Sequence, residues 1–168
     1  MIKTIKIEEA LKLENSVFVD LRSPAEFEEA TIVGSVNIPI FNDEERALLG
    51  KLYSNDSNIA IEKGLEIASH KLMDIYIKFK RLRDDYKNII VFCWRGGMRS
   101  RSIATILHLV RFNNVFLLEG GYKNYRKYIY NKLNELDINF QLIVLHGMTG
   151  VGKTALLKIL DEKGFPVI

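Results

Sequence analysis

The sequence predicts an α/β fold in which a parallel sheet is flanked by helices. Short apolar runs alternate along the chain with segments of helical periodicity, which is typical of parallel strands joined by helices. The 168 residues are 48% hydrophobic and 27% charged, as in globular domains. No apolar run approaches the ~18 residues that a transmembrane helix needs, so a membrane protein is not expected.

Six short apolar runs have the length of strands, and the segments between them show helical patterns. The longest pattern, Ile59–Arg83, spaces its apolar residues by three and four, although Gly64 weakens it slightly. The predicted strands are Thr4–Ile7, Val17–Asp20, Ser35–Ile38, Ile89–Phe92, Val115–Leu118 and Gln141–Leu145. The predicted helices are Ile7–Leu13, Pro24–Glu29, Asp43–Tyr53, Ile59–Arg83, Arg99–Arg111, Tyr122–Leu136 and Lys153–Glu162.

A cysteine loop lies between a predicted strand and a predicted helix. Cys93 ends the apolar run, Gly96 and Gly97 follow, and Arg95 and Arg99 add positive charge. Such a loop can turn backbone N–H groups towards one anion, with the helix N-terminus behind it. A thiol placed there is expected to be a reactive thiolate. The alternative is a buried core cysteine, against which the flanking glycines and arginines argue.

The spacing of Cys93 and Arg99 fits two chemistries. One is a cysteine phosphatase, in which Arg99 clamps a phosphate. The other is a transferase of the rhodanese type, in which the thiolate carries sulfur or selenium. The seven residues from Cys93 to Arg99 are one more than in sulfur-transferring rhodaneses and match their phosphatase-like branch. Loop length therefore does not decide between the two chemistries.

A second motif lies near the end of the chain. Residues 147–154 fit the P-loop pattern G-x-x-x-x-G-K-[ST] between a predicted strand and a predicted helix. Backbone N–H groups around Gly147, Gly150 and Gly152 would wrap a diphosphate that Lys153 neutralises, and Thr154 could bind Mg²⁺ at an incomplete site. About 30 residues cannot bury a core of their own. We expect this segment to dock on the first domain or on a separate chain, or to be poorly ordered.

Charge is unevenly distributed along the chain. The net charge is +3, but residues 1–62 hold 6 Lys/Arg and 12 Asp/Glu, whereas residues 63–168 hold 18 and 9. In the predicted helix after residue 121, Lys123, Arg126 and Lys127 alternate with tyrosines. This pattern fits a surface for single-stranded RNA and fits equally an amphipathic helix with half-buried tyrosines. One cysteine permits no internal disulfide, so a cytoplasmic location is expected.

Several stretches together carry a family resemblance. The chain resembles the tRNA 2-selenouridine synthases, in which a rhodanese domain is fused to a P-loop domain. The resemblance rests on Val19–Phe27, Ile32–Pro39, Phe41–Tyr53, Phe92–Ser100, Gly120–Arg126 and the P-loop. It implies a rhodanese-like domain over residues 1–136, a linker over 137–140 and the first strand–P-loop–helix unit of a truncated second domain over 141–168.

The resemblance also implies an activity. The family replaces sulfur by selenium in wobble 2-thiouridine of tRNA, using selenophosphate and, through a geranylated intermediate, geranyl diphosphate. Cys93 would then carry the nucleophilic chalcogen. The P-loop would hold a diphosphate, and Asp20, Arg22 and His146 are expected to be structural. The donor-binding loop would comprise Trp94, Arg95, Gly96, Gly97, Met98 and Arg99.

The expected partners follow from the same resemblance. They are the tRNA, a selenophosphate-supplying enzyme and a second chain that supplies the rest of the P-loop domain. We expect no tightly bound cofactor and no metal centre. Two alternatives stay open: a stand-alone rhodanese-like sulfur carrier or a Cys-x5-Arg phosphatase, and a non-enzymatic fragment that only binds RNA or a partner.

Overall fold

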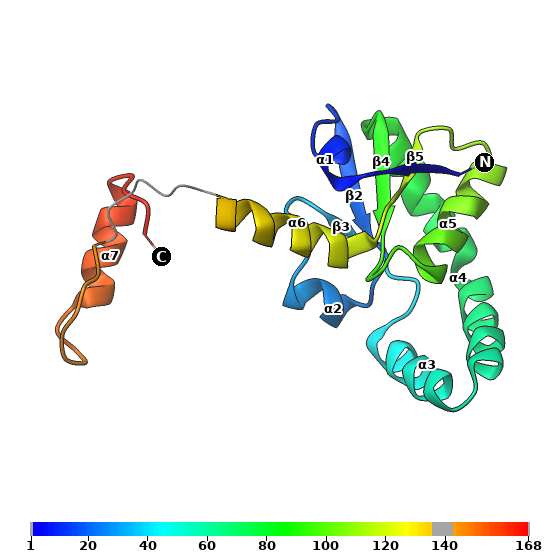
Figure 1. Cartoon of the computed structure of the whole chain (residues 1–168), viewed down its shortest axis with the longest axis horizontal. Helices are drawn as coiled ribbons and strands as arrows, with labels where there is room; N and C mark the ends of the chain where they lie inside the picture. The colour runs from blue at the N-terminus through cyan, green and yellow to red at the C-terminus, as the bar shows by residue number, and fades with distance from the viewer. Residues whose placement is uncertain (1, 136–142, 168) are drawn as a thin grey trace. The chain divides into compact units, whose positions relative to one another are not determined.

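The computed structural model describes residues 2–135 and 143–167 (Figure 1). The chain divides into two compact units, of which the first ends at Glu135. The first unit holds the sheet and all helices but one, and the second holds a single helix among its described residues.

Five parallel strands form one sheet in the order β1-β5-β4-β2-β3. Strand β4 lies at the centre, where Ile89 is opposite Val17 of β2 on one side and Val115 of β5 on the other. This confirms the predicted parallel α/β fold. The strands are β1 (Lys3–Ile5), β2 (Ser16–Asp20), β3 (Val36–Asn37), β4 (Asn88–Phe92) and β5 (Val115–Leu118).

Two hydrophobic cores cover the two faces of the sheet. Successive strand side chains point to opposite faces, so Val91 belongs to one core and Ile90 and Phe92 to the other. Helices α4 and α5 pack on the first face, and α1 and α6 pack on the second (Figure 1). The helices are α1 (Ile7–Ala10), α2 (Pro24–Glu29), α3 (Asp43–Asn55), α4 (Ser57–Asp85), α5 (Met98–Leu109), α6 (Gly121–Glu135) and α7 (Lys153–Glu162).

Capping residues mark the helix boundaries near the predicted positions. Asn42 begins α3 with a capping box, in which its side chain accepts from the Glu45 N–H and Glu45 accepts from the Asn42 N–H. Asp56 ends α3 and caps α4. Helix α4 runs through Gly64 without a break, because Ala60, Ile75 and Phe79 are buried along it. None of the described helices is both long and apolar enough to cross a membrane.

The second unit departs from one expectation. Gln141 and Leu142 of the predicted strand, and the predicted linker 137–140, lie outside the described residues. Residues 143–145 are described and form no strand. A strand needs a neighbour to pair its backbone groups, and the described part of this unit contains no other strand. None of residues 143–167 is buried, so this part of the unit has no core of its own.

Candidate active site

The candidate site lies where β2, β4 and β5 end, at the carboxyl edge of the sheet. The three strands are neighbours, so the loops that follow them meet there. Cys93 follows the last residue of β4, and α5 begins five residues later at Met98. Within the described residues, the backbone N–H groups of residues 94–97 bond to no backbone carbonyl. The loop therefore presents backbone donors beside a helix N-terminus.

Glycine brings the cysteine loop against the start of α6. Gly121 has φ +58°, and a Cβ there would lie 2.2 Å from the Cys93 carbonyl oxygen and 2.5 Å from the Gly96 nitrogen. This close approach lets the Tyr122 and Lys123 N–H groups donate to the carbonyls of Cys93 and Trp94, both at 2.9 Å. The N-terminus of α6 thus holds the first two residues of the loop in place.

Cys93 has one polar neighbour at its sulfur. Its Sγ lies 3.1 Å from Oγ of Ser100, in the first turn of α5. Ser100 is fully buried, and Cys93 is 4% exposed. Either atom can be the donor of this contact, and Ser100 Oγ also donates to the Gly97 carbonyl at 3.4 Å. The structure thus combines burial, which the core alternative required, with a polar setting that a core cysteine would not need.

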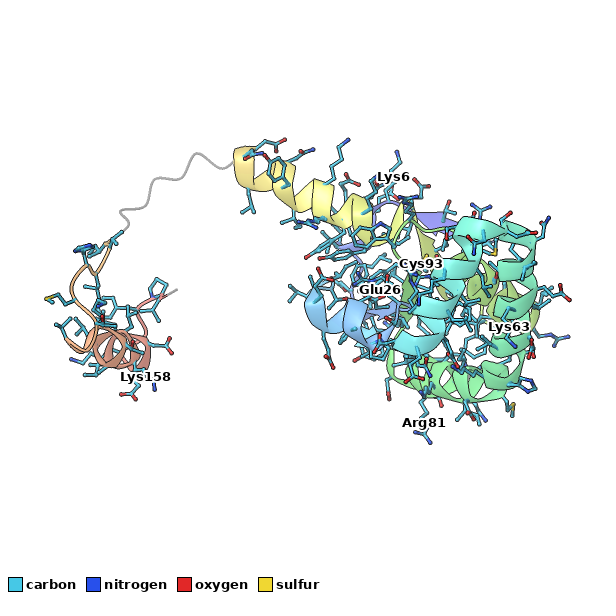
Figure 2. The ribbon with its side chains drawn as sticks, turned by 90° about the horizontal axis from the view of Figure 1, so that it is seen from below. Lys6, Glu26, Lys63, Arg81, Cys93 and Lys158 are labelled. Carbon is cyan, nitrogen blue, oxygen red and sulfur yellow. The ribbon has the colours of Figure 1, made fainter. Side chains whose placement is uncertain are left out.

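The two arginines of the loop differ in their surroundings. Arg95 is exposed, whereas Arg99 is half-buried and binds Glu26 of α2. Arg99 donates from Nη1 to Glu26 Oε2 at 2.8 Å and from Nη2 to Oε1 at 3.4 Å. Burial alone would raise the pKa of Glu26, but the hydrogen bond and charge of Arg99 outweigh it and lower that pKa. Figure 2 shows Glu26 and Cys93 at this part of the first unit.

A buried ion pair lies beside the cysteine loop. Arg22 donates to Asp20 from Nη2 at 2.6 Å and also to the Ala30 carbonyl, and both side chains are almost fully buried. The Arg22 guanidinium lies 4.2 Å from the centre of the Tyr122 ring and 5.9 Å from that of Trp94. All of these partners are internal to the first unit, and a structural role for the pair stays a prediction.

The predicted RNA-binding helix, α6, is amphipathic. Lys123, Arg126 and Lys127 are exposed on it. Tyr122 belongs to the second core, and Tyr125 and Tyr128 pack against that core. Core packing therefore accounts for these three tyrosines without RNA, whereas the cations remain exposed to solvent.

In the second unit, the Lys153 side chain binds the first two residues of the predicted P-loop. Lys153 Nζ donates to the carbonyls of Gly147 and Met148 at 2.8 and 2.7 Å. Gly150 and Gly152 both have φ +85°, and Gly152 is the N-cap of α7. Thr154, in the first turn of α7, is exposed, as is His146. The ammonium group is therefore held over the loop next to a helix N-terminus.

The family model of the rhodanese-like domain matches residues 5–128. The chain belongs to the rhodanese-like domain family. The first unit therefore has the fold that the marker stretches predicted.

No group of three or more His, Cys, Asp or Glu side chains in the described residues is arranged to hold a metal ion.

Relatives of this rhodanese-like chain include longer proteins. It is 35% identical to the tRNA 2-selenouridine synthase of Bdellovibrio bacteriovorus over 171 residues, which cover 99% of this chain and 44% of the relative. It is 34% identical to the tRNA 2-selenouridine synthase of Nitrosomonas europaea, over 88% of this chain and 39% of that one. The resemblance is thereby confirmed, and the chain spans less than half the length of these curated relatives.

A solved structure resembles the rhodanese-like unit. It is the N-terminal domain of a protein from Clostridium difficile 630 described as an ATP/GTP-binding protein, with 44% sequence identity and a TM-score of 0.73. The alignment covers 76% of this chain and 98% of that domain.

Two residues of the site had no predicted role. Ser100 lies in the predicted loop motif, and its position in the first turn of α5 could have indicated that it faces Cys93. Glu26 is 73 residues from Arg99 in sequence, and no local pattern relates the two. Only the fold brings them together.

Proposed function

We propose that this chain forms the nucleophilic part of a tRNA-modifying selenotransferase, which replaces sulfur by selenium in wobble 2-thiouridine. The observation that carries the proposal is the Cys93 thiol beside Ser100 at the N-terminus of α5, within a rhodanese-like domain. The similarity to tRNA 2-selenouridine synthases supports the substrate class. Selenophosphate is the proposed selenium donor.

The cysteine loop supplies the chemistry for an anionic donor. Cys93 is the nucleophile, and the hydroxyl of Ser100 stabilises its thiolate. The backbone N–H groups of residues 94–97 and the guanidinium groups of Arg95 and Arg99 bind the oxyanion of selenophosphate. Trp94, Gly96, Gly97 and Met98 complete this binding loop, in which Gly96 permits the close approach to Gly121.

The P-loop takes a second anion. Gly147, Gly150, Gly152, Lys153 and Thr154 hold the diphosphate of geranyl diphosphate, which supplies the geranyl group of the sulfur intermediate. The positive φ of Gly150 and Gly152 and the position of the Lys153 ammonium group support this assignment. Mg²⁺ at Thr154 would need acidic ligands from residues beyond this motif.

The tRNA is proposed to contact Lys123, Arg126 and Lys127 on α6, which are exposed. Phosphate contacts of this kind release counterions, so binding should weaken steeply as salt is raised. Salt-insensitive binding would contradict this surface. A selenophosphate-supplying enzyme and a chain that completes the P-loop domain are the other proposed partners, and the cytoplasm is the proposed location.

The test is selenation of tRNA that carries 2-thiouridine, with selenophosphate and geranyl diphosphate supplied. It is run on the protein alone and with the remainder of the P-loop domain added as a separate chain. Replacing Cys93 by Ala should abolish 2-selenouridine formation and leave the circular dichroism spectrum unchanged. Selenation retained by the Cys93→Ala variant would contradict the assignment of Cys93 as the nucleophile.

A phosphatase is the second candidate. It is favoured by the seven-residue spacing from Cys93 to Arg99 and by the hydroxyl of Ser100 beside the sulfur. Hydrolysis of an aryl phosphate, lost on Cys93→Ser, would support it. Transfer of sulfur from thiosulfate to cyanide would instead indicate a stand-alone sulfurtransferase.

A further inference from the structure

Glu26 holds one end of the Arg99 guanidinium. Its two carboxylate oxygens accept from Nη1 and Nη2, which is the end-on arrangement of a bidentate pair. Within the described residues, no hydrogen bond engages the Nε of Arg99. A guanidinium group has five N–H donors in one plane. Glu26 occupies the end formed by Nη1 and Nη2. The edge formed by Nε and Nη2 therefore stays available to a second acceptor.

Glu26 is itself held from two directions. Its Oε2 accepts from the Ser23 N–H at 3.2 Å, within the capping box of α2. The same oxygen lies 3.5 Å from Nε of Arg46, on α3. The side chains of Glu26 and Arg99 are 22% and 19% exposed, whereas Arg46 is 43% exposed. Glu26 is thus held by the backbone of its own helix cap and by Arg46, a cation that is more exposed than Arg99.

We propose that Glu26 is a positioning residue, which fixes the guanidinium of Arg99 end-on so that its Nε edge is ready for an oxyanion in the Cys93 loop. This inference rests on the proposed function, because it presumes an anion in that loop. A free arginine side chain samples many rotamers, so a pre-held Arg99 loses less freedom when an anion binds. Arg46 acts only through Glu26.

The single cysteine of the sequence makes the test specific to the loop. Iodoacetamide alkylates Cys93 alone, and the concentration of inorganic phosphate that halves the alkylation rate measures anion binding there. Phosphate bound at the P-loop does not enter this measurement. The ratio of the iodoacetate to the iodoacetamide rate, without phosphate, gives a second measure of anion attraction near the sulfur.

Variants separate position from charge. Glu26→Ala should raise the half-protecting phosphate concentration about three- to tenfold, the effect of ordering one long side chain, and should lower the iodoacetate ratio. Glu26→Gln keeps an acceptor oxygen for Arg99 and should stay within about twofold of wild type. Glu28→Ala removes a carboxylate from an exposed position of the same helix and controls for net charge.

Arg46 provides a further check. Arg46→Ala should weaken phosphate protection less than Glu26→Ala does, because Arg46 is more exposed. In the Glu26→Ala background the Arg46→Ala change should have no further effect, since Arg46 acts only through Glu26.

The outcomes overturn different statements. Tighter phosphate protection in Glu26→Ala would mean that Glu26 competes with the anion, and unchanged protection would mean that it has no role. Loss in Glu26→Gln equal to that in Glu26→Ala would also overturn the proposal. If phosphate does not protect wild-type Cys93 and Arg95→Ala and Arg99→Ala leave the iodoacetate ratio unchanged, the anion site of the proposed function fails as well.

Discussion

At the scale of single residues, the site depends on what surrounds one thiol. Cys93 is almost fully buried. The Ser100 hydroxyl lies 3.1 Å from its sulfur, in the first turn of α5. Reactivity of Cys93 should therefore depend on Ser100 more than on any other neutral side chain near it.

Replacing Ser100 by Ala should slow the alkylation of Cys93 by iodoacetamide about three- to tenfold at neutral pH, because one hydrogen bond to the thiolate is lost. The second-order rate constant of alkylation is measured for both proteins under identical conditions. Thr105→Ala is the matched control, since Thr105 Oγ1 donates to the Arg101 carbonyl on the same helix and away from the sulfur. An unchanged alkylation rate in Ser100→Ala would refute the role of the hydroxyl.

At the scale of elements, loops and helices are joined by close backbone contact and by ion pairs. The loop after β4 and the start of α6 touch through Gly96 and Gly121. Glu26 joins α2 to α5, and Glu45 of α3 binds Lys71 of α4. Contacts of both kinds fix how the elements around the site are arranged.

Gly121→Ala should be strongly destabilising, because a Cβ would overlap the Cys93 carbonyl and the Gly96 nitrogen. Gly34→Ala is the control, since Gly34 has φ +77° and open space around it. In urea unfolding, the control should lose only about 1–2 kcal/mol of unfolding free energy, which is the cost of a left-handed backbone for alanine. Gly121→Ala should lose clearly more. Equal losses would show that backbone conformation, and not the close approach, requires the glycine.

Acid should weaken the α3–α4 contact. Burial would raise the pKa of Glu45, but the hydrogen bond from Lys71, the Asn42 N–H and the Lys71 charge outweigh it and lower that pKa below its usual value of 4.5. A lowered folded-state pKa stabilises the fold above the unfolded pKa, and this contribution is lost as the pH falls through the folded value. Glu45→Gln should therefore lose about 0.5 kcal/mol of unfolding free energy near neutrality, and the difference should shrink as the pH falls below 4.5 and disappear below the folded-state pKa of Glu45.

The measurement is urea unfolding of both proteins across this pH range. Glu44→Gln, at an exposed neighbouring position, controls for the change in net charge. A Glu45→Gln difference that persists undiminished in acid would show that the ion pair with Lys71 is not its source.

At the scale of the whole molecule, all of the core lies in the first unit. The buried hydrophobic residues of the described chain lie between Ile5 and Tyr122. Helix α7 has ten residues and no buried side chain. The two units should therefore differ in whether they fold alone.

A fragment of residues 1–135 should fold cooperatively, with a single urea transition and the sheet intact. A peptide of residues 141–168 should show little helix by circular dichroism, because isolated helices shorter than about 12–15 residues are marginal in water. A strongly helical peptide, or an unfolded 1–135 fragment, would contradict this division.

Local patterns were sufficient for the elements of the first unit. The apolar run Ile89–Phe92 and the spacing in Ile59–Arg83 predicted β4 and α4 to within two residues at each end, because a strand and a helix each repeat their burial over a few residues. The glycines and arginines around Cys93 likewise predicted a loop between a strand and a helix. The P-loop pattern predicted α7 in the same way.

Contacts between distant residues needed the tertiary structure. The order β5-β4-β2 brings α2 to the start of α5, and only this places Glu26 against Arg99. From the sequence, the tyrosines of α6 could stack on bases or pack inward. In the structure, Tyr122 packs inward, in the core that contains Ile90 and Phe92. Residues 143–145 are apolar and extended in pattern, yet form no strand. Periodicity belongs to one segment, whereas pairing and burial depend on what the rest of the chain places beside it.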